Sequence, residues 1–458
     1  MTFGWKAGAN AGCVFLFSYF RLMPASPALL PSSSRPWYQN AAGVVLLHLL
    51  LLAALTSALY AFGIIRYLPA EDTLMRWDVL WYDQIRQGGY QYSADNLSNS
   101  AFFPLFPYFW RVTGLGLLGM GLLNASIFLV AAAWLAHRLQ VPFRLQLLWL
   151  STPSFLFMIV PYTEALFFAF AALVVVGVQR RQLLWWILGL LGCGLSRSAS
   201  TMFTPALLFM VLLWATQPGQ LRRALVWGAT GLLTLALTVG VVAFIQWKQV
   251  GEPFAFALAQ KHWGHFLQWP RLYFNDPSGT NVLWLDATAL WWGVAAIGTC
   301  CWLAWRWLQH VRRRQLFPAI PPEVVFSLGY CVCVCLFMLS HQGGSMWNFG
   351  RYVLATPFFL VVLNYVAAQP AWPRRYYALL LAGTLLLWQV FGIYTQGFDS
   401  FTTPQAVWYF GLVTAYLAVY VAWRQLRWQR EATMLLYVFN LVVMLHLLDG
   451  WLQFYVVQ

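Results

Sequence analysis

Long apolar runs alternate with short polar segments along most of the chain. A helix needs about 20 consecutive apolar residues to cross the hydrocarbon core of a bilayer, within a range of roughly 17–25. Runs of about this length predict about 13 spans, near residues 41–65, 115–137, 143–160, 163–179, 183–199, 201–216, 224–247, 286–308, 323–341, 352–368, 376–394, 405–423 and 432–450. Several runs between 143 and 216 are short and interrupted by Pro or Ser, so about 11 spans are an alternative. The pattern predicts an all-α polytopic membrane protein.

The first 40 residues lack this pattern. They contain Pro24, Pro27, Pro31 and the run Ser32-Ser33-Ser34, which are unfavourable for a continuous helix. We expect residues 1–40 to form a poorly ordered cytoplasmic extension, and residues 41–458 to form a single transmembrane domain.

Composition narrows the class of protein. The chain is 61% hydrophobic and only 9% charged, which excludes an ordinary soluble domain. Its net charge of +14 would suggest a nucleic-acid partner in a soluble protein. Here most basic residues lie in short loops between apolar runs, so membrane topology explains them better, and the expected partner is the lipid bilayer.

The basic residues also orient the chain. With the N-terminus in the cytoplasm, every inner loop carries Lys or Arg, as the positive-inside rule requires. The substantial polar segments then share the outer face, as loops 66–114, 248–285, 341–351 and 395–404. Chemistry gathered on one face is typical of a lipid-linked enzyme, whereas transporters place polar residues within their spans. The short loops favour the bacterial plasma membrane.

A polar stretch after the first span, residues 76–85, contains the first candidate for catalysis. Read as an amphipathic helix, it places Trp77 on an apolar side that would lie at the membrane interface. Asp78 and Tyr82 are four residues apart and share an adjacent face. A carboxylate held in a cleft at the water boundary can act as a general base, and Trp77 and Tyr82 would line that cleft. The alternative is a solvated aspartate on an interfacial helix.

Three basic residues are candidates for binding a phosphate. Arg351 ends a polar, glycine-containing loop at the start of a helix, and its guanidinium suits phosphate by charge and by its fork of donors. Arg197 lies between two apolar runs, where the alternative is a side chain that reaches the lipid head groups. Lys261 and the neighbouring His262 lie in an aromatic loop that could contact a phosphate and a sugar.

Glu164 follows Pro161-Tyr162-Thr163 at a predicted helix start. A carboxylate in this position can stabilise the positive end of the helix dipole. The other interpretation is a polar residue of the substrate cleft. No His or Cys cluster and no Asp-x-Asp pair demands a metal, so no cofactor is required, although a divalent metal is not excluded.

Several of these motifs, in order, resemble the PIG-V-like mannosyltransferases, which are related to GPI mannosyltransferase II within the type-C membrane glycosyltransferases. The resemblance covers about residues 41–420. It rests on Trp77-Asp78 with Trp81-Tyr82 and Gly89-Tyr90, on Ala101-Phe102-Phe103-Pro104-Leu105-Phe106-Pro107, on Pro161-Tyr162-Thr163-Glu164-Ala165-Leu166-Phe167, on Ser196-Arg197-Ser198 and on Gly350-Arg351-Tyr352.

The resemblance implies a type-C bundle that transfers a sugar, usually mannose, from a polyprenyl- or dolichyl-phosphate donor at the non-cytoplasmic face. It implies an inverting mechanism with Asp78 as the base and Arg351 near the donor phosphate. The acceptor stays open between a glycolipid, a glycan and a protein. The alternatives are a flippase for lipid-linked oligosaccharide or polysaccharide and a non-catalytic membrane assembly subunit. Convergence of Asp78 and Arg351 on one outer cavity would favour the enzyme.

Overall fold

The computed structural model of the chain describes residues 40–272, 274, 280–314, 317–369, 378–379, 382–384, 386, 390, 403–421 and 427–454. The predicted N-terminal extension up to residue 39 lies outside the described residues. So do most of the predicted span 376–394 and most of the predicted loop 395–404.

All regular elements of the described residues are helices, which confirms the predicted all-α class. Six of these helices are long and apolar enough to cross a membrane, so the protein is a multi-pass membrane protein. They are α1 (Ala41–Ala61), α4 (Leu117–Arg138), α9 (Leu221–Val250), α11 (Thr280–Arg313), α12 (Pro322–His341) and α17 (Gln429–Leu452). Each contains few charged residues, because a charge in the hydrocarbon core is costly.

Shorter helices fill the space between the long ones. The apolar ones are α5 (Phe143–Leu150), α6 (Glu164–Arg180), α7 (Leu183–Ser196), α8 (Ala199–Ala215), α14 (Pro357–Ala368) and α16 (Thr403–Val421). The remaining elements are α2 (Asp78–Gly88), α3 (Leu105–Thr113), α10 (Ala255–Leu258), α13 (Phe349–Val353) and the 3-10 helices η2 (Asn99–Ala101), η3 (Pro153–Met158) and η4 (Ala259–Lys261). The total number of crossings stays a prediction.

The apolar run 143–160 forms two short helices, α5 and η3, where the pattern predicts one span. The first helix ends before Ser151 and Thr152. The hydroxyl groups of these two residues donate to the carbonyls of Leu148 and Trp149, both at 2.7 Å. Pro153 follows and has no N–H to continue a helix. Hydrophobicity alone could not reveal this break, because both helices are buried and apolar.

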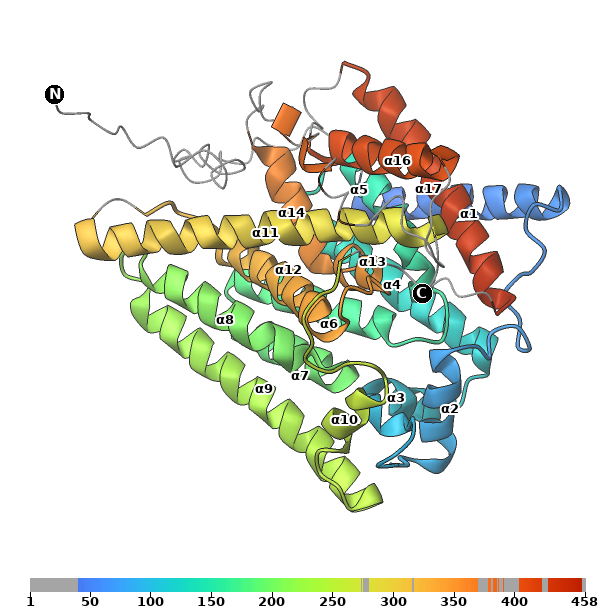
Figure 1. Ribbon diagram of the computed structural model, residues 1–458, viewed down its shortest axis with the longest axis horizontal. Coiled ribbons are helices and arrows are strands. Elements are labelled where there is room, and N and C mark those ends of the chain that lie inside the picture. Colours follow the sequence, from blue (N-terminus) through green and yellow to red (C-terminus); the bar gives the residue numbers. More distant parts are fainter. Residues whose placement is uncertain are drawn as a thin grey trace.

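Two glutamines near the end of α9, the buried Gln246 and the exposed Gln249, anchor the polar loops at one end of the bundle, where α2, α3 and α10 gather (Figure 1). Gln246 is fully buried, donates to the Ser100 carbonyl at 2.8 Å and accepts from the Phe256 N–H at 2.6 Å. Gln249 accepts from the Tyr90 N–H at 2.8 Å. The loop after α1 and the loop after α9 are therefore held against each other by one transmembrane helix.

Helices α6 and α7 pack closely, because a glycine of α7 leaves room for the backbone of α6. A Cβ atom added at Gly189 would lie 2.7 Å from the Val174 nitrogen and 2.8 Å from the Phe170 carbonyl oxygen. Both contacts are with backbone, which cannot move aside without separating the helices. A side chain at this position would therefore push apart α6, which begins at Glu164, and α7, which Arg197 follows.

We expect Gly189→Ala to destabilise the protein by about 1–3 kcal/mol through this overpacking. Gly240→Ala in α9 is the matched control, since a Cβ there meets nothing within 4 Å and Ala favours the helix. Thermal unfolding of the detergent-purified variants measures the difference. Equal melting temperatures for the two variants would contradict the close α6–α7 contact.

Candidate functional site

Asp78 is the first residue of α2, and the residue before it has an unusual backbone. Trp77 has φ +50° and ψ −124°, a conformation that side chains other than glycine rarely adopt. The backbone N–H of Asp78 donates to the Tyr162 hydroxyl group at 3.3 Å, which ties the start of α2 to the segment before α6. Strained residues of this kind gather at functional sites.

The predicted helix is present, but its apolar side is only partly inside the protein, since Leu80 is exposed. Tyr82 and Ile85 are buried, and Trp81 packs edge-on against Trp263 of the loop after α9, with ring centroids 5.4 Å apart. Trp77 contacts the ring of Phe454 near the end of the chain, at a centroid distance of 5.8 Å. Within the described residues the aromatic side of α2 serves packing between loops.

Arg351 lies in α13, directly after a turn made by Asn348. Asn348 adopts the left-handed conformation, with φ +70°, which Asn tolerates better than most residues. The Gly350 N–H donates to the carboxylate of Asp286 in α11, and a Cβ at position 350 would lie 3.1 Å from that oxygen. The turn and this hydrogen bond direct the Arg351 side chain into the protein, where it is 4% exposed.

Glu164, the first residue of α6, connects the charged groups. It is 2% exposed, and its Oε1 atom accepts a hydrogen bond from Nε of Arg351. The same oxygen forms ion pairs with Nη2 of Arg351 and, at 3.1 Å, with Nη1 of Arg197. Nη2 of Arg351 also lies 3.4 Å from Oδ2 of Asp78. Four residues that are distant in the sequence thus form one ionic network, and Glu164 belongs to it as a partner of the arginines.

Aromatic rings support both guanidinium groups. The Arg351 guanidinium lies 4.6 Å from the ring centroid of Phe157 and 4.8 Å from that of Tyr162. Arg197 lies 4.6 Å from the ring centroid of Tyr352. These cation–π contacts favour the charged form of each arginine where water is scarce.

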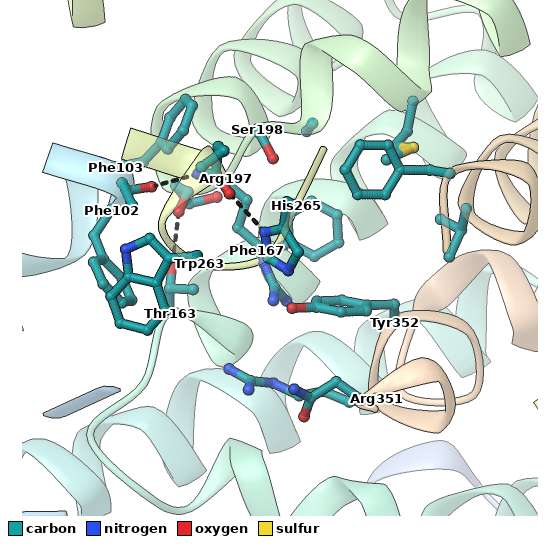
Figure 2. Close-up of a pocket in the computed structure, with 18 of the residues that line it drawn as sticks. Phe102, Phe103, Thr163, Phe167, Arg197, Ser198, Trp263, His265, Arg351 and Tyr352 are labelled. Atoms are coloured by element: carbon teal, nitrogen blue, oxygen red, sulfur yellow. Dashed lines mark hydrogen bonds between the residues drawn. The ribbon is translucent and has the colours of Figure 1, made fainter. Parts of the chain in front are cut away.

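The network borders a cavity of about 240 Å³. Asp78, Tyr82, Arg197 and Arg351 all line it. Figure 2 shows Phe102 and Trp263 at one side of the cavity, Tyr352 at the other, and Arg351 between them in the lower part of the view. Apolar walls with a few convergent polar groups are typical of small-molecule sites.

Three other residues that the sequence suggested do not line this cavity. Lys261 is exposed in η4. The Nε2 atom of His262 is 2.8 Å from the Ala94 carbonyl oxygen. Trp77 contacts Phe454, as described above.

The same loop supplies other residues to the cavity, namely Gln260, Trp263 and His265. The sequence singled out this loop for its aromatic and basic residues, but spacing could not tell which positions face inward. His265 shares a hydrogen bond of 2.7 Å with Oε1 of Gln260, and burial, with a smaller effect of His341, lowers the pKa of its imidazole. In the described part of the chain, no group of three or more His, Cys, Asp or Glu residues could hold a metal ion.

The surroundings shift the acid–base properties of the site. Burial raises the pKa of the Asp78 carboxyl group, and the nearby charge of Arg351 offsets this effect only in part. Burial, reinforced by the Asp78 and Glu164 charges, raises the pKa of Tyr82 well above 10, so this phenol stays protonated. For Arg351, burial lowers the pKa, but the neighbouring acidic groups, with Glu164 first among them, together outweigh this effect, so the guanidinium stays charged. Asp78 is thus a stronger base than an ordinary aspartate.

Donor groups of both arginines are still available to a ligand. Within the described residues, Nη1 of Arg351 and both Nε and Nη2 of Arg197 have no hydrogen-bond partner. Two adjacent guanidinium groups with unused N–H donors suit an oxyanion such as a phosphate. The site can therefore place a base and an anion-binding pair around one small ligand.

We expect Glu164→Ala to destabilise the protein by about 3–5 kcal/mol, because it leaves the buried Arg351 and the half-buried Arg197 without their shared carboxylate. Asp83→Asn is the control, since it affects only the partly exposed contacts of Asp83 with Arg86 and Gln87, and the ion pair with Arg86 is worth up to about 1 kcal/mol. Denaturation of the purified variants measures both values. A similar small loss for the two variants would contradict a structural role of the buried network.

Comparison with known proteins adds no relative from which a role could be transferred. No family model, no curated protein sequence and no solved structure matches this chain.

Proposed function

We propose that this chain is an integral membrane glycosyltransferase. It transfers a hexose, mannose by the resemblance of its motifs, from a polyprenyl- or dolichyl-phosphate donor to a hydroxyl group. The acceptor is a glycolipid, a glycan or a protein, and the reaction takes place at the non-cytoplasmic face of a bacterial plasma membrane. The positive-inside pattern supports this orientation.

One observation carries the proposal. Asp78 and Arg351 are 273 residues apart in the sequence, yet their side chains lie 3.4 Å apart at the edge of one cavity. A base and a phosphate-binding cation are the two groups that transfer from a sugar phosphate to a hydroxyl requires. A flippase or an assembly subunit gives no reason for a half-buried aspartate with a raised pKa to meet an arginine at the edge of a cavity.

The mechanism follows from the roles of these residues. The Asp78 carboxylate removes the proton of the acceptor hydroxyl group, whose oxygen attacks the anomeric carbon of the donor sugar. The bond between that carbon and the phosphate oxygen breaks, and the electron pair leaves with the lipid phosphate. Arg351 and Arg197 stabilise the negative charge that develops on this leaving group, and attack from the opposite face inverts the anomeric centre. Glu164 holds both arginines in place.

Asp78→Asn tests the base. The variant keeps the size of the side chain but cannot accept a proton at neutral pH, so we expect transfer to fall by on the order of 100-fold or more. The assay uses purified protein, polyprenyl-phosphate mannose and a panel of hydroxyl acceptors. Asp83→Asn is the matched control on the same helix, and its pair with Arg86 lies outside the cavity. Near-normal transfer by a folded Asp78→Asn variant would rule out the aspartate base.

The pH dependence of transfer tests the electrostatics. Because Asp78 acts when deprotonated, transfer is present above its pKa and is lost as the pH falls through it, at a value above the ordinary 3.8. The Glu164 charge contributes to raising this pKa, so Glu164→Gln should move the acidic limb to lower pH. In this variant Arg351 and Arg197 lose the Glu164 charge, and their own positive charges, which lower the Asp78 pKa, would move the acidic limb in the same direction. An acidic limb that moved to higher pH would contradict the network.

A further inference from the structure

A second polar group lines the same cavity and takes no part in the ionic network. It comes from the segment between α12 and α13 and consists of Gln342, Trp347 and Asn348. Each has a buried side-chain polar atom without a hydrogen-bond partner among the described residues. These atoms are Oε1 of Gln342, Nε1 of Trp347 and Oδ1 of Asn348.

Unpaired buried polar atoms of this kind are uncommon. Most buried polar groups in proteins are hydrogen-bonded, since an unpaired one destabilises the fold by the full cost of its desolvation. Three of them within seven residues, all on the wall of one cavity, indicate that their partners arrive with a ligand.

The chemistry of the three atoms defines that ligand. None of the side chains is charged, two of the atoms are acceptors and one is a donor. The acceptor oxygens of Gln342 and Asn348 would repel an anion, whereas a hydroxyl group can donate to them and also accept from the Trp347 N–H. The set therefore fits several hydroxyl groups on a neutral ring.

Neighbouring contacts hold this segment in place. Nε2 of Gln342 lies 3.5 Å from Nε2 of His265, so the amide is oriented with its oxygen unused. Asn348 precedes Arg351 by three residues, and the Tyr352 N–H donates to the Asn348 carbonyl at 3.1 Å. A sugar whose phosphate is bound by Arg351 would thus have its ring beside this segment.

We propose that Gln342, Trp347 and Asn348 form a subsite for the hydroxyl groups of a neutral hexose. The proposal deepens the proposed function and rests on it for the identity of the sugar, which belongs to the donor or to the acceptor. Arg351 and Arg197 bind the charged part of the substrate, and this segment recognises the uncharged ring.

Saturation-transfer NMR with methyl α-D-mannopyranoside tests the subsite without requiring catalysis. Wild-type protein in detergent should give a signal. Trp347→Phe, which removes the N–H and keeps a smaller aromatic ring, should weaken binding by about 3- to 10-fold. Asn348→Gly should weaken the binding of the mannoside to a similar extent. Glycine keeps the positive φ of this position, so the variant separates loss of the amide from strain in the turn.

Trp149→Phe is the matched control. Its Nε1 atom is also buried and unpaired among the described residues, but the side chain lies in the core and not in the cavity. Unchanged binding by this variant, with loss in the other two, supports the subsite. Absence of binding by the wild type, or equal binding by all variants, overturns it.

The transfer assay then identifies the source of the ring. A rise in the KM for the lipid-phosphate donor in Trp347→Phe assigns the subsite to the donor sugar, and a rise in the KM for the acceptor assigns it to the acceptor. Unchanged values of both KM overturn the subsite while leaving the proposed function intact. Conversely, hexose binding that depends on Trp347 in a protein without transfer activity supports the subsite and refutes the proposed function.

Discussion

The Glu164 carboxylate pairs with two arginines in the interior of the protein, and the arrangement of the site depends on this shared contact. A buried arginine without a partner would cost several kcal/mol, so α13 and the junction between α7 and α8 must both meet the start of α6. Through Arg351 the same contact reaches Asp78 and fixes the start of α2. One carboxylate thus aligns four separate segments around the cavity.

Hydrogen bonds from two transmembrane helices, α9 and α11, also hold the loops around the cavity in place. Gln246 in α9 binds the two loops at one side of the cavity, and Asp286 in α11 binds the backbone next to Arg351. These polar groups lie near one end of apolar helices, where each finds a hydrogen-bond partner. The bundle therefore acts as a rigid support for loops that carry the chemistry.

Hydrophobic runs were sufficient to predict an all-α membrane protein, because the bilayer leaves helices as almost the only way to satisfy the backbone of an apolar segment. They could not predict the break at Ser151–Thr152, where side-chain hydrogen bonds to the backbone and Pro153 end a helix inside an apolar run.

For the candidate site, the type of a residue predicted its role better than its position in the sequence did. Asp78, Glu164, Arg197 and Arg351 were candidates because charges are rare beside membrane spans, and they form one network. In the loop after α9 the sequence suggested Lys261 and His262, but Trp263 and His265 line the cavity. The inward positions of an irregular loop depend on tertiary contacts, such as the bond between His265 and Gln260, that no periodic pattern records.

An experimental structure of the protein in lipid nanodiscs with a polyprenyl monophosphate tests most directly whether the two arginines bind the phosphate. We predict that the phosphate lies in the cavity, within roughly 2.7–3.2 Å of the guanidinium nitrogens of Arg351 and Arg197. We also predict that Asp78 stays at the edge of the same cavity. A phosphate bound elsewhere on the protein, with this cavity empty, would contradict the phosphate-binding role of the arginines.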